Sequence, residues 1–185
     1  KVISRRNSIN RIEYVNDPTI MAWEIANEPR PMRPAVNAAY AKFLSDTAAL
    51  IRTLDPKHLI TIGHEGYIGT ESVELFEKVH AVANIDYLTI HIWPKNWGWL
   101  ADADLDKALA NAEVETRKYI DLNLAVADKL NKPLVIEEFG FPRDGRSFDR
   151  TAATHLRDRY FEAVLSNIGG TVAGANFWAF AGRGR

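Results

Sequence analysis

Five short apolar runs alternate along the 185-residue chain with longer segments whose apolar residues recur at helical spacing. The short runs are rich in β-branched and aromatic residues, as buried strands are. The predicted strands are residues 19–25, 59–62, 87–92, 133–138 and 171–178. The predicted helices are residues 36–54, 71–79, 102–130 (one helix, or two separated by a kink) and 151–166. Strands that alternate with helices in this way indicate βα units and a parallel sheet.

The segments between these strands and helices also carry patterns that predict their structure. Residues 1–16 are predicted as the end of a helix, which Asn16-Asp17-Pro18 closes. A proline-rich loop is expected over residues 30–34 and a glycine-rich loop over residues 63–69.

The strand count decides between two architectures. A complete small doubly wound domain is one alternative, but a sheet that ended with residues 171–178 would leave an unpaired edge. A closed β/α barrel needs eight strands and typically about 250 residues. We therefore predict that residues 1–185 form a single, partial domain, namely the C-terminal five strands of a (β/α)8 TIM barrel. The N-terminal barrel strands and the last helix are then expected from the rest of the parent protein.

Composition removes several classes of function. The net charge is −1 and the basic residues are scattered, so neither a nucleic acid nor an anionic membrane is predicted as a partner. There is no apolar stretch long enough to span a bilayer. Cysteine is absent, and so are a His-Glu-x-x-His zinc motif and a Gly-x-Ser-x-Gly elbow. No cofactor and no metal are expected.

Two predicted strands lead into a glutamate that is followed by a turn-forming residue. These are Glu28, shortly after residues 19–25, and Glu138, in residues 133–138. In a β/α barrel the strand ends open onto one face, where the active site lies. Carboxylates on different strands can reach the separation of about 5–5.5 Å that a retaining glycosidase requires. The high tryptophan count agrees with this, since flat aromatic faces suit sugar rings.

The motifs around both glutamates resemble glycoside hydrolase family 5, a family of retaining (β/α)8 enzymes. They are Asn27-Glu28-Pro29 and, about a hundred residues later, Glu138-Phe139-Gly140. The longer strings at residues 17–24, 91–97 and 137–144 are similar to the β-mannanase branch of that family. The resemblance covers the whole chain as barrel strands four to eight. It implies that Glu28 is the general acid/base and Glu138 the nucleophile.

The resemblance also implies roles for neighbouring side chains. Asn27 would reach the 2-hydroxyl of the sugar under attack, unless it only shapes the turn. His91 would line the site beside the nucleophile, the alternative being a core histidine. Trp178 would form the floor beneath the cleaved sugar, the alternative being a core aromatic. Glu137 and Glu24 are expected to be structural, with Glu24 buried near the acid and Glu137 paired with backbone or an arginine.

One position departs from the family pattern. Relatives often carry a tyrosine where this chain has Trp93, and its hydroxyl touches the nucleophile. Trp93 is still expected at the site, but an indole has a different reach from a phenol.

Further candidate substrate contacts lie in loops on the predicted catalytic side. His64 and Glu65 follow the second strand, where family members carry a similar Glu-Gly, so both are candidate substrate contacts. Trp97 and Trp99 could stack on sugar or pack their own loop. Arg143 and Arg183 could reach distal hydroxyls, but solvated surface charge is the favoured interpretation.

The sequence thus predicts a retaining endo-β-1,4-mannanase that acts on β-mannan or a related plant polysaccharide. Within the same class, a β-1,4-glucanase and an exo-β-mannosidase remain alternatives. Outside it, an incomplete barrel could bind carbohydrate without turnover. A polymeric substrate makes a secreted or periplasmic location the expectation, although residues 1–16 carry no signal peptide.

Overall fold

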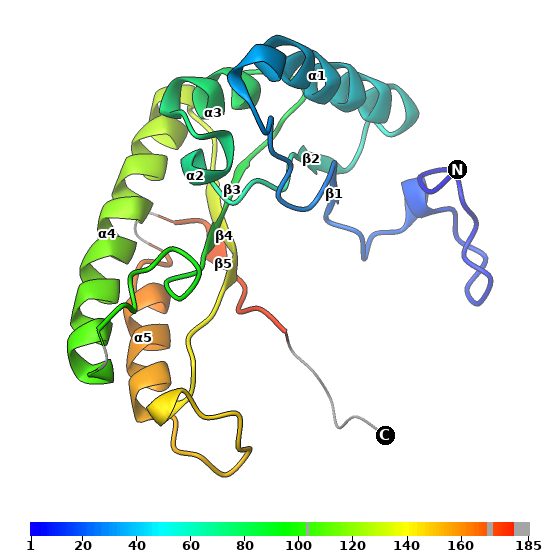
Figure 1. The fold of residues 1–185 in the computed structure, drawn as a ribbon. Coiled ribbons are helices and arrows are strands. Elements are labelled where there is room, and N and C mark those ends of the chain that lie inside the picture. Colours follow the sequence, from blue (N-terminus) through cyan, green and yellow to red (C-terminus); the bar gives the residue numbers. More distant parts are fainter. Residues whose placement is uncertain (103, 170–171, 180–185) are drawn as a thin grey trace. The chain divides into compact units, whose positions relative to one another are not determined.

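The computed structural model describes residues 1–102, 104–169 and 172–179. Within it the chain forms two compact units. Unit 1 comprises Lys1–Thr89 and Ala127–Pro133, and unit 2 comprises Ile90–Val126 and Leu134–Arg185 as far as the latter is described. Figure 1 labels the elements in chain order.

Unit 1 is built around a parallel pair of strands, β1 (Ala22–Glu24) and β2 (Leu59–Thr61), which pair Trp23 with Ile60. The parallel pairing continues past both strands. The backbone N–H of Ala26 donates to Ile62 O at 3.2 Å, and that of Glu28 donates to Gly63 O at 2.8 Å. Both predicted strands are therefore confirmed with narrower bounds, and residue 28 lies where β1 ends.

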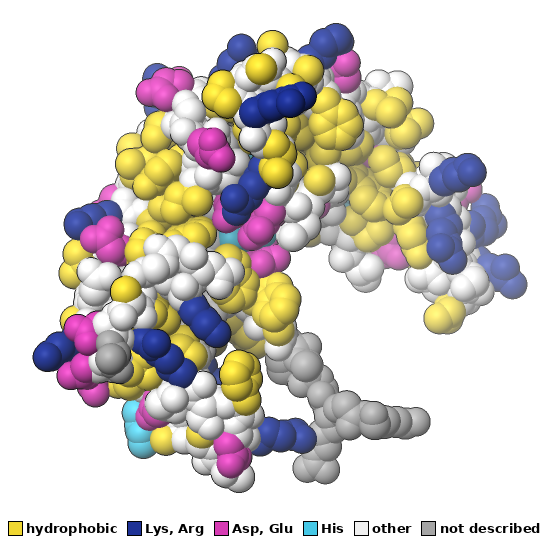
Figure 2. All heavy atoms as spheres, in the orientation of Figure 1, with side chains coloured by type: hydrophobic (Ala, Val, Ile, Leu, Met, Phe, Trp, Pro, Cys, Tyr) yellow, Lys and Arg dark blue, Asp and Glu magenta, His cyan; other side chains and the backbone are white. Residues whose placement is uncertain are grey.

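Helices cover the strand pair of unit 1. They are η2 (Pro34–Val36), α1 (Asn37–Leu54), α2 (Tyr67–Thr70) and α3 (Val73–His80). The helix predicted for residues 36–54 is confirmed as α1, and its core face is formed by Leu44 and Ala48, which are buried against Ile60 and Ile62. The apolar positions that helical spacing picks out in the sequence, Ala39, Phe43, Leu50 and Leu54, are exposed instead. Figure 2 shows hydrophobic side chains beside charged ones on the surface of this part of the molecule. The short helix α2 occupies part of the segment predicted as a glycine-rich loop.

The prediction of a helix end over residues 1–16 is wrong. The structure has an isolated antiparallel bridge between Arg6 and Glu13, followed by the short 3-10 helix η1 (Tyr14–Asn16). Asn7 Oδ1 accepts the backbone N–H of Ile9 at 2.9 Å, and Asn10 Oδ1 accepts that of Ile12 at 3.0 Å. Asparagine side chains that bind nearby backbone in this way compete with a helix and favour turns.

Three strands form the second sheet, in the order β3-β4-β5, among the described residues. They are β3 (Leu88–Ile92), which continues from unit 1 into unit 2, β4 (Leu134–Phe139) and β5 (Gly174–Ala175). β4 and β5 are parallel, with Ile136 opposite Ala175. Two backbone bonds extend that pairing, from Asn176 N to Ile136 O at 2.8 Å and from Trp178 N to Phe139 O at 3.0 Å. The predicted start of the last strand, Thr171, lies outside the described residues.

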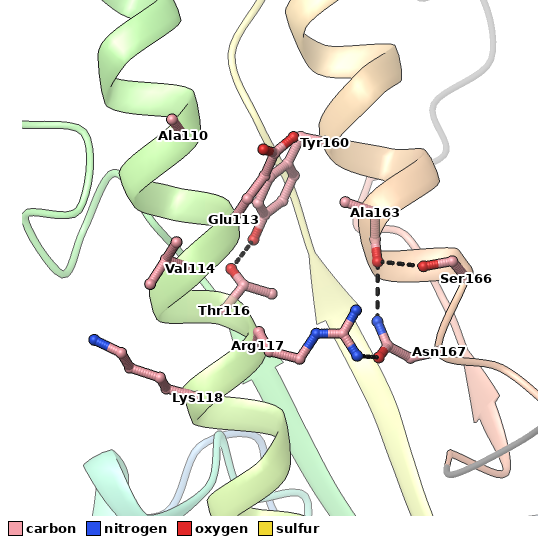
Figure 3. A pocket seen from close by; sticks show the side chains of 10 residues that line it. All are labelled: Ala110, Glu113, Val114, Thr116, Arg117, Lys118, Tyr160, Ala163, Ser166 and Asn167. Carbon is pink, nitrogen blue, oxygen red and sulfur yellow. Dashed lines mark hydrogen bonds between the residues drawn. The ribbon is translucent and has the colours of Figure 1, made fainter.

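The helices that follow β3 and β4 are α4 (Leu105–Leu130) and α5 (His155–Leu165), with the 3-10 turn η3 (Asp144–Arg146) before α5. α4 is one continuous helix, which settles the choice between one helix and two. Tyr160 of α5 is buried against α4, where its hydroxyl lies 2.7 Å from Thr116 Oγ1 (Figure 3). Among the described helices, none has both the length and the apolar character needed to cross a bilayer.

Candidate active site

Glu28 lies at the turn in which β1 ends. It adopts a left-handed backbone conformation with φ of +48°, which non-glycine residues seldom do. The bond from its N–H to Gly63 O holds this turn against the end of β2. The side chain is half-buried, so it is neither enclosed in the core nor fully exposed to solvent. Asn27, one residue earlier, is exposed.

Gly63 is the residue that allows the end of β1 to approach so closely. Its φ is +86°, and a Cβ atom there would lie 2.2 Å from Ala26 O and 2.3 Å from Glu24 Oε1. The expectation that Glu24 is buried is wrong, because Glu24 is exposed at the end of β1, after the half-buried Ala22 and Trp23. The carboxylate of Glu24 instead lies against Gly63.

His64 and Glu65 are fully buried within unit 1. The ring Nε2 of His64 hydrogen-bonds the hydroxyl of Tyr40, which also donates to Pro29 O at 2.8 Å. Glu65 forms an ion pair with Arg30. These contacts favour a structural role, in which both residues tie the loop after Glu28 to the loop after β2. Contact with substrate stays a prediction for His64 and Glu65.

Tyr40 and Arg30 were not identified from the sequence as part of this region. Tyr40 belongs to α1 and Arg30 to the proline-rich loop, so neither is adjacent in sequence to its partner. Helical spacing alone identifies Tyr40 only as a core-facing position. Burial raises the pKa of Tyr40, so the hydroxyl remains protonated and can donate.

A buried histidine, His80, packs behind His64. The two ring centroids lie 5.0 Å apart in an edge-on arrangement, and His80 Nδ1 lies 2.8 Å from Phe76 O. Burial lowers the pKa of His80 to about 4, and the nearby Lys132 adds to this, although the bond to Phe76 acts in the opposite direction. His80 is therefore a neutral core residue at neutral pH.

In unit 2, His91 lies on β3 beside the end of β4. It is fully buried, and its Nδ1 lies 3.5 Å from Glu138 Oε2. Its other nitrogen, Nε2, lies 3.5 Å from Glu137 Oε2. The predicted proximity of His91 to Glu138 is thus present in the structure. Glu137 is predicted to pair with backbone or an arginine, whereas the side chain that the structure places near it is His91.

Two tryptophans lie next to each other near the ends of β3 and β4. Trp93 and Trp178 meet edge-on, with ring centroids 5.6 Å apart. Trp93 also lies against Gly140, where a Cβ atom would approach its ring to 2.8 Å. Trp178 remains 56% exposed, which leaves an open indole surface at the end of the last strand. Trp93 therefore supports Trp178, and the ring of His91 lies next to Glu138.

Trp97 is placed differently from Trp178. Its ring centroid lies 4.9 Å from that of Trp99 and 4.9 Å from that of Tyr119, a buried residue of α4. The amide of Asn111 on α4 donates to Trp99 O at 2.9 Å. These contacts favour loop packing for Trp97 and Trp99, and sugar stacking by them stays a prediction.

For neither candidate arginine does the structure show a position at the site. Arg143 donates to Ala152 O at 3.1 Å and so closes its own loop. Arg183 lies outside the described residues.

A surface pocket between α4 and α5 is lined by residues that include Glu113, Arg117 and Asn167 (Figure 3). Arg117 and Asn167 hydrogen-bond each other across it at 2.9 Å, and none of its lining residues is a predicted site residue.

Helices alternate with parallel strands, and a carboxylate lies where β1 and β4 end, the end of the strands at which (β/α)8 barrels place their active sites. A family model described as GH family 5 beta-mannosidase-like matches residues 1–185. The chain belongs to glycoside hydrolase family 5. The resemblance inferred from the two glutamate motifs is confirmed.

Individual relatives agree with this assignment. Mannan endo-1,4-beta-mannosidase 1 of Solanum lycopersicum is 32% identical over 205 residues, which cover 100% of this chain and 48% of the relative. The glycoside hydrolase family 5 mannosidase from Rhizomucor miehei, an alanine variant in complex with mannosyl-fructose, has a TM-score of 0.85. It is 33% identical, with coverage of 100% of this chain and 45% of that one.

A third relative comes from a bacterium. The hyperthermostable endo-1,4-beta-D-mannanase from Thermotoga petrophila RKU-1 has a TM-score of 0.77 at 25% identity, covering 100% of this chain and 52% of that one. The chain thus spans about half the length of these relatives. The predicted fold class, a portion of a (β/α)8 barrel, is confirmed.

Proposed function

We propose that the protein to which this chain belongs is a retaining endo-β-1,4-mannanase. The observation that carries the proposal is the family match over residues 1–185, which includes both strand ends that bear a glutamate. The relative from Solanum lycopersicum is named a mannan endo-1,4-beta-mannosidase, and that from Thermotoga petrophila an endo-1,4-beta-D-mannanase. Glu28 and Glu138 are the residues that we assign to the chemistry.

The barrel fold supplies the reason why these two residues would act together. Glu28 follows β1, and Glu138 is the penultimate residue of β4, so each lies at the carboxyl end of its strand. In a (β/α)8 barrel all such ends open onto one face. Two glutamates on that face can meet at the short separation that double displacement needs, about 5–5.5 Å.

The reaction then proceeds in two balanced steps. Glu138 attacks the anomeric carbon and forms a glycosyl ester, while Glu28 gives its proton to the departing glycosidic oxygen. Glu28 next removes a proton from water, the water oxygen attacks the anomeric carbon, and Glu138 leaves as a carboxylate. The product keeps the β configuration because the carbon is inverted twice.

Other side chains would position the substrate. The exposed Asn27 is suited to bind the 2-hydroxyl, where hydrogen bonds strengthen in the transition state. The open face of Trp178 is suited to the apolar C–H face of a mannose ring. Trp93 keeps the Trp178 indole in place from one edge. A polymeric substrate also implies action outside the cytoplasm, so we propose a secreted or periplasmic location.

A second candidate is a mannosidase that acts on chain ends. One specific observation favours it: the Rhizomucor miehei structure, in complex with mannosyl-fructose, gives a TM-score of 0.85 against 0.77 for the Thermotoga petrophila mannanase. The products distinguish the two activities. An endo-acting enzyme releases a mixture of mannooligosaccharides early in the reaction, whereas an exo-acting one releases mannose from the first minutes.

Reducing-sugar release from β-mannan and from carboxymethyl cellulose tests the proposal. The wild-type protein is compared with Glu138→Ala and with Glu162→Gln, an exposed carboxylate on α5 that serves as the matched control. We expect the wild-type protein to cleave mannan, the rate to fall about 10³-fold in Glu138→Ala, and Glu162→Gln to keep the wild-type rate. Cleavage of carboxymethyl cellulose but not of mannan would show that the protein is a β-glucanase with the same mechanism. Sugar binding by folded protein without any cleavage would establish the non-enzymatic alternative.

A further inference from the structure

Glu137 has no role in the proposed reaction, yet its carboxylate is not free in solvent. The side chain is only 20% exposed, and Oε2 is buried without a hydrogen-bond partner among the described residues. A buried carboxylate oxygen carries a large desolvation cost unless a cation or donor compensates it. The ring of His91 lies near it, with Nε2 at 3.5 Å.

The same ring faces the nucleophile. His91 Nδ1 lies 3.5 Å from Glu138 Oε2, so one fully buried imidazole has an adjacent carboxylate of β4 at each nitrogen. A neutral imidazole offers one N–H and one lone pair, which would leave a lone pair directed at a carboxylate. An imidazolium offers an N–H to each carboxylate. With both carboxylates ionised, the arrangement therefore matches a doubly protonated ring.

We infer that Glu137 is a positioning residue that acts on Glu138 through His91. The carboxylate of Glu137 holds the Nε2 edge of the ring, and the Nδ1 edge then fixes the rotation of the Glu138 carboxylate through its Oε2 atom. This inference about positioning depends on the proposed function for its catalytic consequence, but its structural part does not.

The structural part is tested by ¹⁵N NMR of the histidine side chains in the folded protein at pH 7. His91→Gln identifies the His91 signals. We expect both ring nitrogens of His91 to be protonated in the wild type. In Glu137→Gln we expect the Nε2 resonance to move while the other four histidines stay in place. A wild-type ring with a single protonated nitrogen would overturn the inference, and this result is read from the wild-type spectrum once the His91 signals have been assigned.

The catalytic part is tested by steady-state kinetics on mannan with Glu137→Gln and the control Glu162→Gln. Misorientation of the nucleophile is expected to lower kcat by about 10- to 100-fold in Glu137→Gln and to leave KM within about twofold. An unchanged kcat in a folded Glu137→Gln protein would overturn the positioning role. If the wild type cleaves no mannan, the proposed function fails, and the NMR result still decides the pairing of Glu137 with His91.

Discussion

The indole nitrogen of Trp23 donates a hydrogen bond to Asp55 Oδ2 at 2.7 Å and so links β1 to the turn before β2. Asp55 is fully buried and also accepts the backbone N–H of Lys57 at 2.9 Å and the ring Nδ1 of His58 at 2.6 Å. Burial raises the pKa of Asp55, but the hydrogen bonds from Trp23, His58 and the backbone outweigh burial and hold it well below its usual range. This hydrogen-bonded group fixes the strand pair that presents Glu28.

Asp55→Ala is expected to lower the free energy of unfolding by about 3 kcal/mol, because it leaves buried donors without their acceptor. Urea denaturation at pH 7 measures the loss, with Asp46→Ala, an exposed carboxylate of α1, as the control within about 0.5 kcal/mol. The depressed pKa means that the contribution of Asp55 is present above its ordinary pKa and is lost as the pH falls through the folded value. Equal midpoints for the two variants would show that the Asp55 hydrogen bonds do not stabilise the fold.

Gly63→Ala is expected to be severely destabilising, by about 3 kcal/mol or more, since its Cβ atom would overlap Ala26 O and the Glu24 side chain. Gly98→Ala is the matched control. Gly98 also has a positive φ, of +76°, but a Cβ there meets no atom within 4 Å, so only the backbone strain of about 1 kcal/mol applies. Thermal unfolding of both variants checks this difference. Similar losses in both would mean that the close approach at Gly63 is not a constraint.

His80 gives the fold a defined acid sensitivity. Its folded pKa of about 4 lies below the ordinary value of 6.5, so the unfolded chain binds more protons in that interval. Stability from this group is therefore complete above about pH 6.5 and declines toward pH 4, by roughly 3 kcal/mol in total. Urea midpoints from pH 7 to pH 4 for the wild type and His80→Asn measure the effect, with the exposed His155→Asn as the control. A His80→Asn profile parallel to that of the wild type would contradict the assignment.

The two classes of tryptophan are expected to respond in opposite ways. Trp178→Ala removes an exposed ring and should raise KM on mannan about tenfold with little loss of stability. Trp97→Ala removes a ring packed on Tyr119, so it should cost about 2 kcal/mol of stability and leave KM near the wild-type value. Kinetics and thermal melts on both variants separate these effects. A KM increase for Trp97→Ala as large as that for Trp178→Ala would restore Trp97 as a sugar contact.

The strand and helix order could be predicted from the sequence because apolar runs and helical spacing follow directly from burial. The prediction of a helix end over residues 1–16 is wrong because the side chains of Asn7 and Asn10 bind nearby backbone. The spacing of apolar residues gives no information about such local hydrogen bonds. The pairing of His91 with Glu138 was accessible through the family motif. Its second pairing, with Glu137, was not, because it depends on the register of β3 against β4. The contacts of His64 with Tyr40 and of Glu65 with Arg30 likewise depend on packing between distant segments.

The assignment of Glu138 as the nucleophile of a retaining mannanase is tested most directly by trapping the glycosyl-enzyme. The protein is incubated with an activated 2-deoxy-2-fluoro-mannoside, which forms the ester but hydrolyses it slowly, and the labelled peptide is mapped by mass spectrometry. We predict one fluoromannosyl group per chain, attached to Glu138 and absent in Glu138→Gln. Attachment to Glu137 or another residue would contradict this account, and so would turnover of mannan by folded protein that forms no adduct.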